Sequence, residues 1–234
     1  MAAAQASGGA VAVMVLCDIH PGERIWGYSR FLFGRFTLPA VRGLRFFKVL
    51  GAGYESGFGL RPSASRQGFF GVFDDDASAD HFINDSSLMK GYRDHSREFF
   101  AVKLRVFSSR GSWSGMTLPA TDAEPERGPI AALTRASIRP ALARAFWKQA
   151  PLTQRSLEGA EGCLFAAGVG EAPLLRQATF TMWESVAHMD AYARSGAHLE
   201  AIKAAKLNNY FSESMFVRFV PYDAQGVWLE RAYG

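Results

Sequence analysis

Histidines are the side chains best suited to bind a metal or move a proton near neutral pH. Four of the five lie in polar or turn-like surroundings and are expected at the surface: His20, His81, His95 and His188. His198 differs, because it opens a helical pattern with small apolar residues at helical spacing: Ala201, Ile202 and Ala205. A flat macrocycle could approach such a face, so His198 is a candidate iron ligand. A capping or core histidine is the alternative.

Other chemical motifs are excluded by their spacing. The glycine-rich run 51–57 has Ser56 where a dinucleotide fingerprint needs glycine, and no helical pattern follows it. Cys17 and Cys163 are the only cysteines, and neither has a partner at zinc-ligand spacing. Lys and Arg number 26 against 22 Asp and Glu, and the charges are spread along the chain. Nucleic acid is therefore not an expected partner.

An internal repeat indicates how the chain is built. The segment 71–82 resembles the segment 181–192, with Phe73 matching Trp183 and Phe82 matching Tyr192 (183 − 73 and 192 − 82 both give 110). The apolar runs on either side of both segments follow the same order. At this offset, position 88 is a leucine where the second copy has His198. A repeat of this length predicts two equivalent halves.

Each half is predicted to contain strand, helix, strand, strand, helix and strand. The first helices are expected at about 23–36 and 140–150, and the second helices after Asp74–Asp76 and after Glu184. This order is the ferredoxin-like split βαβ unit. We therefore predict an α+β fold of tandem duplicated ferredoxin-like halves, with facing antiparallel sheets. The halves are 10–113 and 129–228, joined by a linker at 114–128 within one compact domain overall.

Composition gives an ordinary globular chain that is rich in aromatic residues. Of the 234 residues, 48% are hydrophobic and 19 are phenylalanine. The apolar run 10–17 is too short to span a membrane, and the first residues lack a basic leader pattern, so we expect a cytoplasmic location. The segment 24–48 interleaves aromatic residues with arginines. It predicts either a helix packed on the sheet or, as the alternative, a membrane-surface helix.

Several segments resemble the spheroidene monooxygenase family. In the second half they are Arg127–Ala136, Gly168–Pro173, Gln177–Trp183, His198–Lys203 and Tyr210–Phe219. In the first half they are Arg24–Trp26, Gly51–Gly53, Gly57–Phe58 and Trp113–Gly115. The resemblance covers almost the whole chain after about residue 10. It implies an enzyme of the dimeric α/β-barrel superfamily that uses dioxygen and haem to introduce keto groups into acyclic carotenoids.

The resemblance also implies roles for individual residues. In haem proteins of this superfamily the iron ligand lies on the C-terminal helix of the second half, where His198 stands. The cofactor would be haem b, the oxidant dioxygen or a peroxide, and the electron donor a protein such as a ferredoxin. Arg135, in an otherwise apolar strand, is the candidate catalytic residue opposite the iron ligand, with a salt bridge as the alternative. Lys203 and Arg218 are candidate partners of the haem propionates, with a solvated face as the alternative.

Three other functions stay open on the sequence. One is a haem enzyme of different chemistry, of the aldoxime dehydratase or peroxidase type. Another is a haem or lipophile carrier without catalysis, and the third is a monooxygenase of the same fold that uses no cofactor. A hydrophobic substrate is expected to line up along phenylalanines, Met182 and Trp183. Self-association and peripheral membrane contact are left open as partners.

Overall fold

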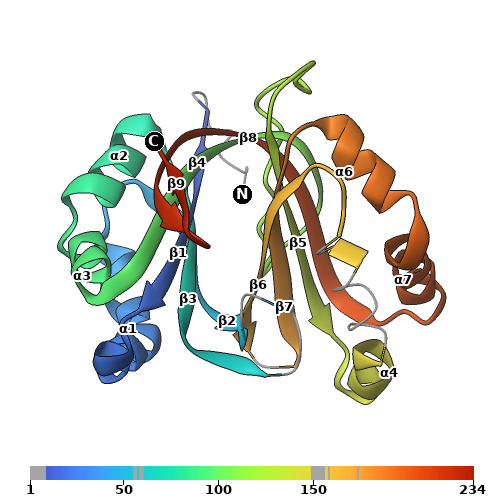
Figure 1. Cartoon of the computed structure of the whole chain (residues 1–234), viewed down its shortest axis with the longest axis horizontal. Helices are drawn as coiled ribbons and strands as arrows, with labels where there is room; N and C mark the ends of the chain where they lie inside the picture. Colours follow the sequence, from blue (N-terminus) through green and yellow to red (C-terminus); the bar gives the residue numbers. More distant parts are fainter. Residues whose placement is uncertain (1–8, 55–56, 58–60, 149–155, 158, 173) are drawn as a thin grey trace, which may run out of the picture. The chain divides into compact units, whose positions relative to one another are not determined.

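The computed structural model describes the chain except for residues 1–8, 55–56, 58–60, 149–155, 158 and 173 (Figure 1). The chain divides into two compact units. Unit 1 comprises residues 1–50, 64–105 and 221–234, and unit 2 comprises residues 51–63 and 106–220. The units differ from the predicted halves at their edges, because four strands run from one unit into the other: β2 (Leu44–Gly53), β3 (Pro62–Phe73), β4 (Ser96–Gly111) and β8 (Phe211–Trp228).

The first part of the chain supplies most of unit 1. Its elements are β1 (Val11–Ile19), the short helix Pro21–Glu23, α1 (Arg24–Thr37), the short helix Leu38–Ala40, β2 (Leu44–Gly53), β3 (Pro62–Phe73), α2 (Asp76–Asp85), α3 (Ser87–His95) and β4 (Ser96–Gly111). The strand order is β4-β1-β3-β2, and β1 is antiparallel to both of its neighbours. All nine residues of β1 are buried, as expected for an apolar central strand.

The second part repeats this order. Its elements are β5 (Ile130–Ile138), the short helix Pro140–Leu142, α4 (Ala143–Trp147), β6 (Cys163–Ala172), β7 (Arg176–Trp183), α6 (Val186–Ala193), α7 (Gly196–Leu207), β8 (Phe211–Trp228) and β9 (Arg231–Tyr233). In unit 2 the order is β6-β7-β5-β8, and the end of β2 pairs with β6. In each unit the helices cover one face of the sheet (Figure 1).

The 110-residue repeat is confirmed at the helix starts. Phe73 and Trp183 end equivalent strands, β3 and β7. Two residues later, the Asp75 side chain accepts a hydrogen bond from the Ser78 N–H at the start of α2, and Ser185 accepts from the His188 N–H at the start of α6. These are matching N-caps.

Two helices follow β3 in unit 1 and β7 in unit 2, separated by Ser86 and by Ser195. The break at Ser195 agrees with the separate helix expected to open near His198, whereas the break at Ser86 was not predicted. Ser86 has an extended backbone and its hydroxyl accepts from the Met89 N–H, which starts a new helix rather than continuing the old one.

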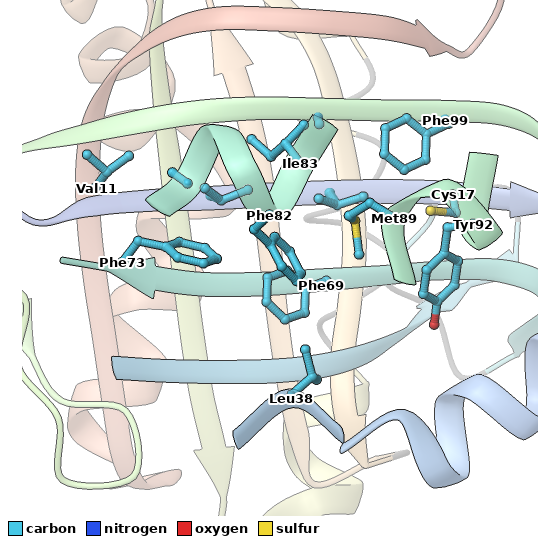
Figure 2. Packing of buried hydrophobic residues seen from close by; sticks show 14 of the residues in the cluster. Val11, Cys17, Leu38, Phe69, Phe73, Phe82, Ile83, Met89, Tyr92 and Phe99 are labelled. Carbon is cyan, nitrogen blue, oxygen red and sulfur yellow. The ribbon is translucent and has the colours of Figure 1, made fainter. Parts of the chain in front are cut away.

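The helix-covered face of unit 1 is a dense apolar core. Figure 2 shows Phe69 and Phe73 of β3 beneath Phe82 of α2, with ring centroids 4.9 and 5.1 Å from the Phe82 ring. Met89 of α3 is completely buried in the same cluster. Burial of large side chains from both helices fixes α2 and α3 on this sheet.

Candidate functional site

The candidate site lies on the helix-covered face of the sheet of unit 2. Ile130 and Ala132 of β5 point to this face, since they pack with Met189 of α6. Side chains alternate along a strand, so Thr134 points the same way. Thr134 is exposed, although β5 is hydrogen-bonded on one side to β7 and on the other to β8. At Thr134, solvent therefore reaches this face of the sheet.

The equivalent place in unit 1 is filled. The pair Val15–Phe69 stands four residues before the end of β3, as the pair Thr134–Thr179 stands four residues before the end of β7. Val15 and Phe69 are buried in the core shown in Figure 2. Thr179 is only half-buried. Two threonines thus replace a valine and a phenylalanine, which leaves room over the second sheet that the first lacks.

Helix α7 contacts α6 and buries none of its own residues. The His198 ring packs against Tyr192 of α6, with centroids 4.7 Å apart and planes inclined by 31°. Its Nδ1 atom is shielded from solvent and has no hydrogen-bond partner among the described residues. Burial lowers the pKa of His198, which favours the neutral imidazole that metals bind.

The counterpart of His198 in unit 1 is an ordinary core residue. The 110-residue offset gives Leu88, and counting from the N-caps Ser86 and Ser195 gives Met89. Both pack on the first core. An unpaired buried ring nitrogen is costly, so an imidazole in place of these apolar side chains requires a partner that the described protein atoms do not supply.

A cavity of about 270 Å³ adjoins the His198–Tyr192 pair. Its lining includes Tyr192 and His188 of α6 and the turn Ser195–Ala197. The volume lies at the low end for pockets that hold organic ligands, which run from about 300 Å³ upwards. The cavity alone does not hold a macrocycle.

The structure corrects the role expected for Arg135. Its side chain lies on the face of the sheet opposite Thr134, away from His198, because adjacent residues alternate. The guanidinium is buried and forms ion pairs with Glu171, at 3.1 Å, and with Glu213. This is the salt bridge that the sequence left as the alternative. Arg135 holds the strands β5, β6 and β8 together and does not face the open side.

Glu213 anchors the polypeptide where β4 ends. Although burial acts against it, hydrogen bonds from the Gly115 and Ser114 N–H groups, the Ser112 hydroxyl and Arg135 lower the pKa of Glu213 to about 2. The carboxylate is therefore charged at neutral pH. It fixes the turn that follows Gly111, at the start of the predicted linker.

Arg218 and Lys203, the residues predicted to meet haem propionates, each pair with a carboxylate of the protein in this structure. Arg218 pairs with Asp190 of α6 at 2.6 Å, and in unit 1 Lys103 pairs with Asp80 of α2 at 2.7 Å. Asp80 and Asp190 are related by the same 110-residue offset, so the pair is a repeated structural link between helix and sheet. Lys203 pairs with the exposed Glu200 at 2.8 Å, on the solvated face of α7.

Met182 and Trp183, expected along a substrate path, are core residues. Trp183 is almost completely buried, and its indole N–H donates to the Thr181 hydroxyl at 2.8 Å. Met182 is also buried. The sequence analysis missed Thr134, Thr179 and Tyr192. The repeat offered a signal for two of them, because Thr179 and Tyr192 stand where the first half has Phe69 and Phe82.

Comparison with known proteins gives the family. No family model matches the chain. A spheroidene monooxygenase of Rubrivivax gelatinosus is 56% identical over 230 residues, which cover 97% of this chain and 88% of the relative. The chain belongs to the spheroidene monooxygenase family. A family member from Rhodobacter capsulatus is 34% identical, over 87% of this chain and 86% of its own length. The chain is accordingly an oxidoreductase of the monooxygenase class.

Solved structures give the fold of this spheroidene monooxygenase family member. An aldoxime dehydratase aligns with a TM-score of 0.58 and 11% identity, covering 92% of this chain and 81% of that chain. A second, in complex with butyraldoxime, aligns with a TM-score of 0.56 and the same identity, over 92% of this chain and 79% of that chain. This likeness concerns the fold alone and confirms the predicted α+β class of tandem ferredoxin-like halves.

Proposed function

We propose that the chain is a haem-dependent monooxygenase of a long apolar polyene of the carotenoid class, with His198 as the iron ligand. The observation that carries the proposal is the Nδ1 of His198, which is shielded from solvent and has no hydrogen-bond partner among the described residues. Family membership supports the reaction class, and the name of the relatives supports the substrate class. Among the described residues, no three His, Cys, Asp or Glu side chains gather as a metal site. A haem iron needs only one protein ligand.

The residues present fit a haem. The neutral imidazole of His198 can donate a lone pair, and Tyr192 fixes the plane of its ring. Thr134 and Thr179 are small enough to leave a flat floor over the sheet, while the apolar neighbours Ala132 and Met189 bound it. When bound, haem would supply the activation of dioxygen or a peroxide that a monooxygenase requires.

The protein's own contribution is to hold the neutral imidazole of His198 in a fixed orientation and to offer an apolar surface to the substrate. His198 keeps its proton off at neutral pH because burial lowers its pKa, so it remains a ligand rather than an imidazolium. An apolar substrate would gain by leaving water for this surface. With dioxygen as oxidant, the reaction also requires an electron donor such as a ferredoxin.

The test is the absorption spectrum of the purified protein after expression with added haem. The wild type should show a Soret band, and His198→Ala should lose it or shift it. Free imidazole should partly restore it by occupying the vacated position. The variant should still fold, because alanine is the best helix former. His188→Ala is the matched control, since its Nδ1 is already paired with the Ser185 hydroxyl at 3.0 Å.

Two results would overturn the proposal. A wild-type spectrum in His198→Ala would place the iron ligand elsewhere. A wild type without any Soret band, yet active on a carotenoid, would show a monooxygenase that needs no haem.

A further inference from the structure

Helix α1 of unit 1 carries an apolar face that the protein leaves uncovered. Five large apolar side chains of this helix are between 48% and 86% exposed: Ile25, Tyr28, Leu32, Phe33 and Phe36. No other described element exposes more than two. We call these five residues the outer face of α1. Exposed apolar side chains normally occur singly, so five on one helix mark an interaction surface.

The outer face is not the result of a loosely attached helix. On the opposite side, Trp26 stacks on His95 of α3 with centroids 4.2 Å apart and meets Tyr92 edge-on at 5.2 Å. Gly27 is buried, and a Cβ there would meet Ile19 and Gln67 at 3.1 Å. The helix is thus packed closely through its inner side. A helix packed on the sheet, as the sequence predicts, accounts for the inner side of α1. It leaves the outer face unexplained.

The geometry of the outer face suits a flat apolar medium. At about 100° per residue, Ile25, Tyr28, Leu32 and Phe36 fall within about 80° of the helix circumference. A helix of 14 residues is about 21 Å long. The outer face is therefore a straight apolar strip along the whole helix. No described helix is both long enough and apolar enough to cross a membrane.

Charge decides which partner fits. Between residues 24 and 48 there are six Arg and Lys residues and no Asp or Glu. Arg24 is exposed at the first turn of α1, and Arg42 is exposed shortly after its end. A second copy of the same face would oppose arginines to arginines, which is unfavourable. Anionic phospholipid headgroups above an apolar interior match both the charge and the strip.

We propose that α1 binds the surface of an anionic lipid bilayer, lying in its plane with the outer face inserted among the acyl chains. Arg24 and Arg42 contact the headgroups at the two ends of the helix. This inference concerns unit 1 alone and does not depend on haem. It adds to the proposed function a location at which a polyene dissolved in the membrane would be taken up.

The test is co-sedimentation of the full-length protein with vesicles of phosphatidylcholine, with and without phosphatidylglycerol. The triple variant Ile25→Ser, Leu32→Ser, Phe33→Ser should partition at least about tenfold more weakly into both, because each side chain forfeits apolar burial. The matched control removes three exposed leucines elsewhere, Leu174→Ser, Leu207→Ser and Leu229→Ser, and should bind like the wild type. Unchanged thermal melting will show that both variants fold.

A second pair of variants separates charge from apolar contact. Arg24→Gln with Arg42→Gln should lose the preference for phosphatidylglycerol and the weakening of binding at higher ionic strength, while keeping the binding to phosphatidylcholine. Wild-type protein that stays in the supernatant would overturn the proposal. So would a wild type that sediments as a dimer in the absence of lipid and a serine triple variant that is monomeric, since the outer face would then be a contact between two copies.

Discussion

One residue distinguishes the chemistry of the two repeated halves. His198 occupies the place of Leu88 or Met89, which pack on the core of unit 1. A core can exchange leucine for methionine at little cost, but an imidazole adds two polar atoms that need partners. Its Nδ1 has none among the described protein groups. This unpartnered atom is the reason that we propose His198 as a ligand-binding residue.

Arg135, by contrast with His198, is a buried polar residue whose charge is paired within the protein. Its two carboxylate partners satisfy the charge that the apolar strand could not, and Trp113 donates its indole N–H to Glu171 at 2.8 Å. A buried arginine by itself does not distinguish a catalytic group from a structural one. The identity of its partners does, and those come from strands distant in the sequence.

Glu213 provides a pH-dependent prediction. Its pKa is about 2 in the folded protein against an ordinary value of 4.5, so the folded state binds fewer protons than the unfolded state between about pH 5 and pH 2. Its contribution to stability is present above that range and is lost as the pH falls through it. Glu213→Gln should lower the free energy of unfolding at pH 7 by about 1–3 kcal/mol. The free energy of unfolding of this variant should also fall less steeply than that of the wild type between about pH 5 and pH 2. Urea titrations at several pH values measure this.

The control is Glu200→Gln, because Glu200 is exposed and pairs only with Lys203 at the surface. It should leave the pH dependence of the free energy of unfolding unchanged at acid pH. An equal pH dependence in the wild type and in Glu213→Gln would show that the network around Arg135 does not depend on this carboxylate.

At the scale of elements, the helices of the two units are attached to their sheets in the same way, but the residues packed beneath them differ. The N-caps of α2 and α6 match, and a basic residue of the last strand holds each helix through Asp80 or Asp190. The packing beneath the helices differs because small or polar residues on the second sheet replace large apolar ones on the first. A repeat thus preserves the links that position helices while freeing the space beneath them.

Refilling that space should remove cofactor binding. Thr134→Val with Thr179→Phe copies the residues of unit 1 into unit 2 and should leave the melting temperature equal or higher, because apolar burial is gained. Haem titration followed by absorption should show at least about a tenfold weaker affinity. The mirror control, Phe69→Leu in unit 1, should lower stability by about 1–3 kcal/mol and leave the haem titration of the folded protein unchanged. Full haem affinity in the refilled variant would exclude this face as the site.

At the scale of the whole molecule, stability is unevenly divided. Five residues of α2 and α3 are buried, against one in α6 and none in α7: Ala79, Phe82, Ile83, Met89 and Tyr92 in unit 1 and Met189 in unit 2. Apolar burial holds helices on sheets, so we expect α7 to open more readily than α2 and α3. A ligand that binds only the closed arrangement would stabilise it.

Hydrogen exchange measures this difference. In protein freed of haem, amides of α7 should exchange at least about tenfold faster than those of α2 and α3. Adding haem should slow exchange in α6 and α7 of the wild type, and should have no effect in His198→Ala. Protection gained only in α2 and α3 would place the ligand in unit 1 and contradict the proposed site.

The sequence by itself determined the repeat, the order of elements and the family. These follow from local patterns, such as the matched segments 71–82 and 181–192, which need no knowledge of distant contacts. It also singled out His198, because one half has an imidazole where the other has an apolar residue. The helix break at Ser86 escaped prediction, since a serine can cap a helix or lie within it and the backbone decides which.

Only the tertiary structure decided what Arg135, Arg218 and Thr134 do. The partners of Arg135 are 36 and 78 residues away, and Arg218 meets Asp190 across 28 residues. Which face of a strand is covered depends on the helices that pack there, and not on the amino-acid sequence of the strand alone. Thr134 lies in a central strand, between β7 and β8, whose sequence suggests full burial, yet it is exposed. Burial and pairing are properties of the assembled chain, and they separate a binding surface from a core.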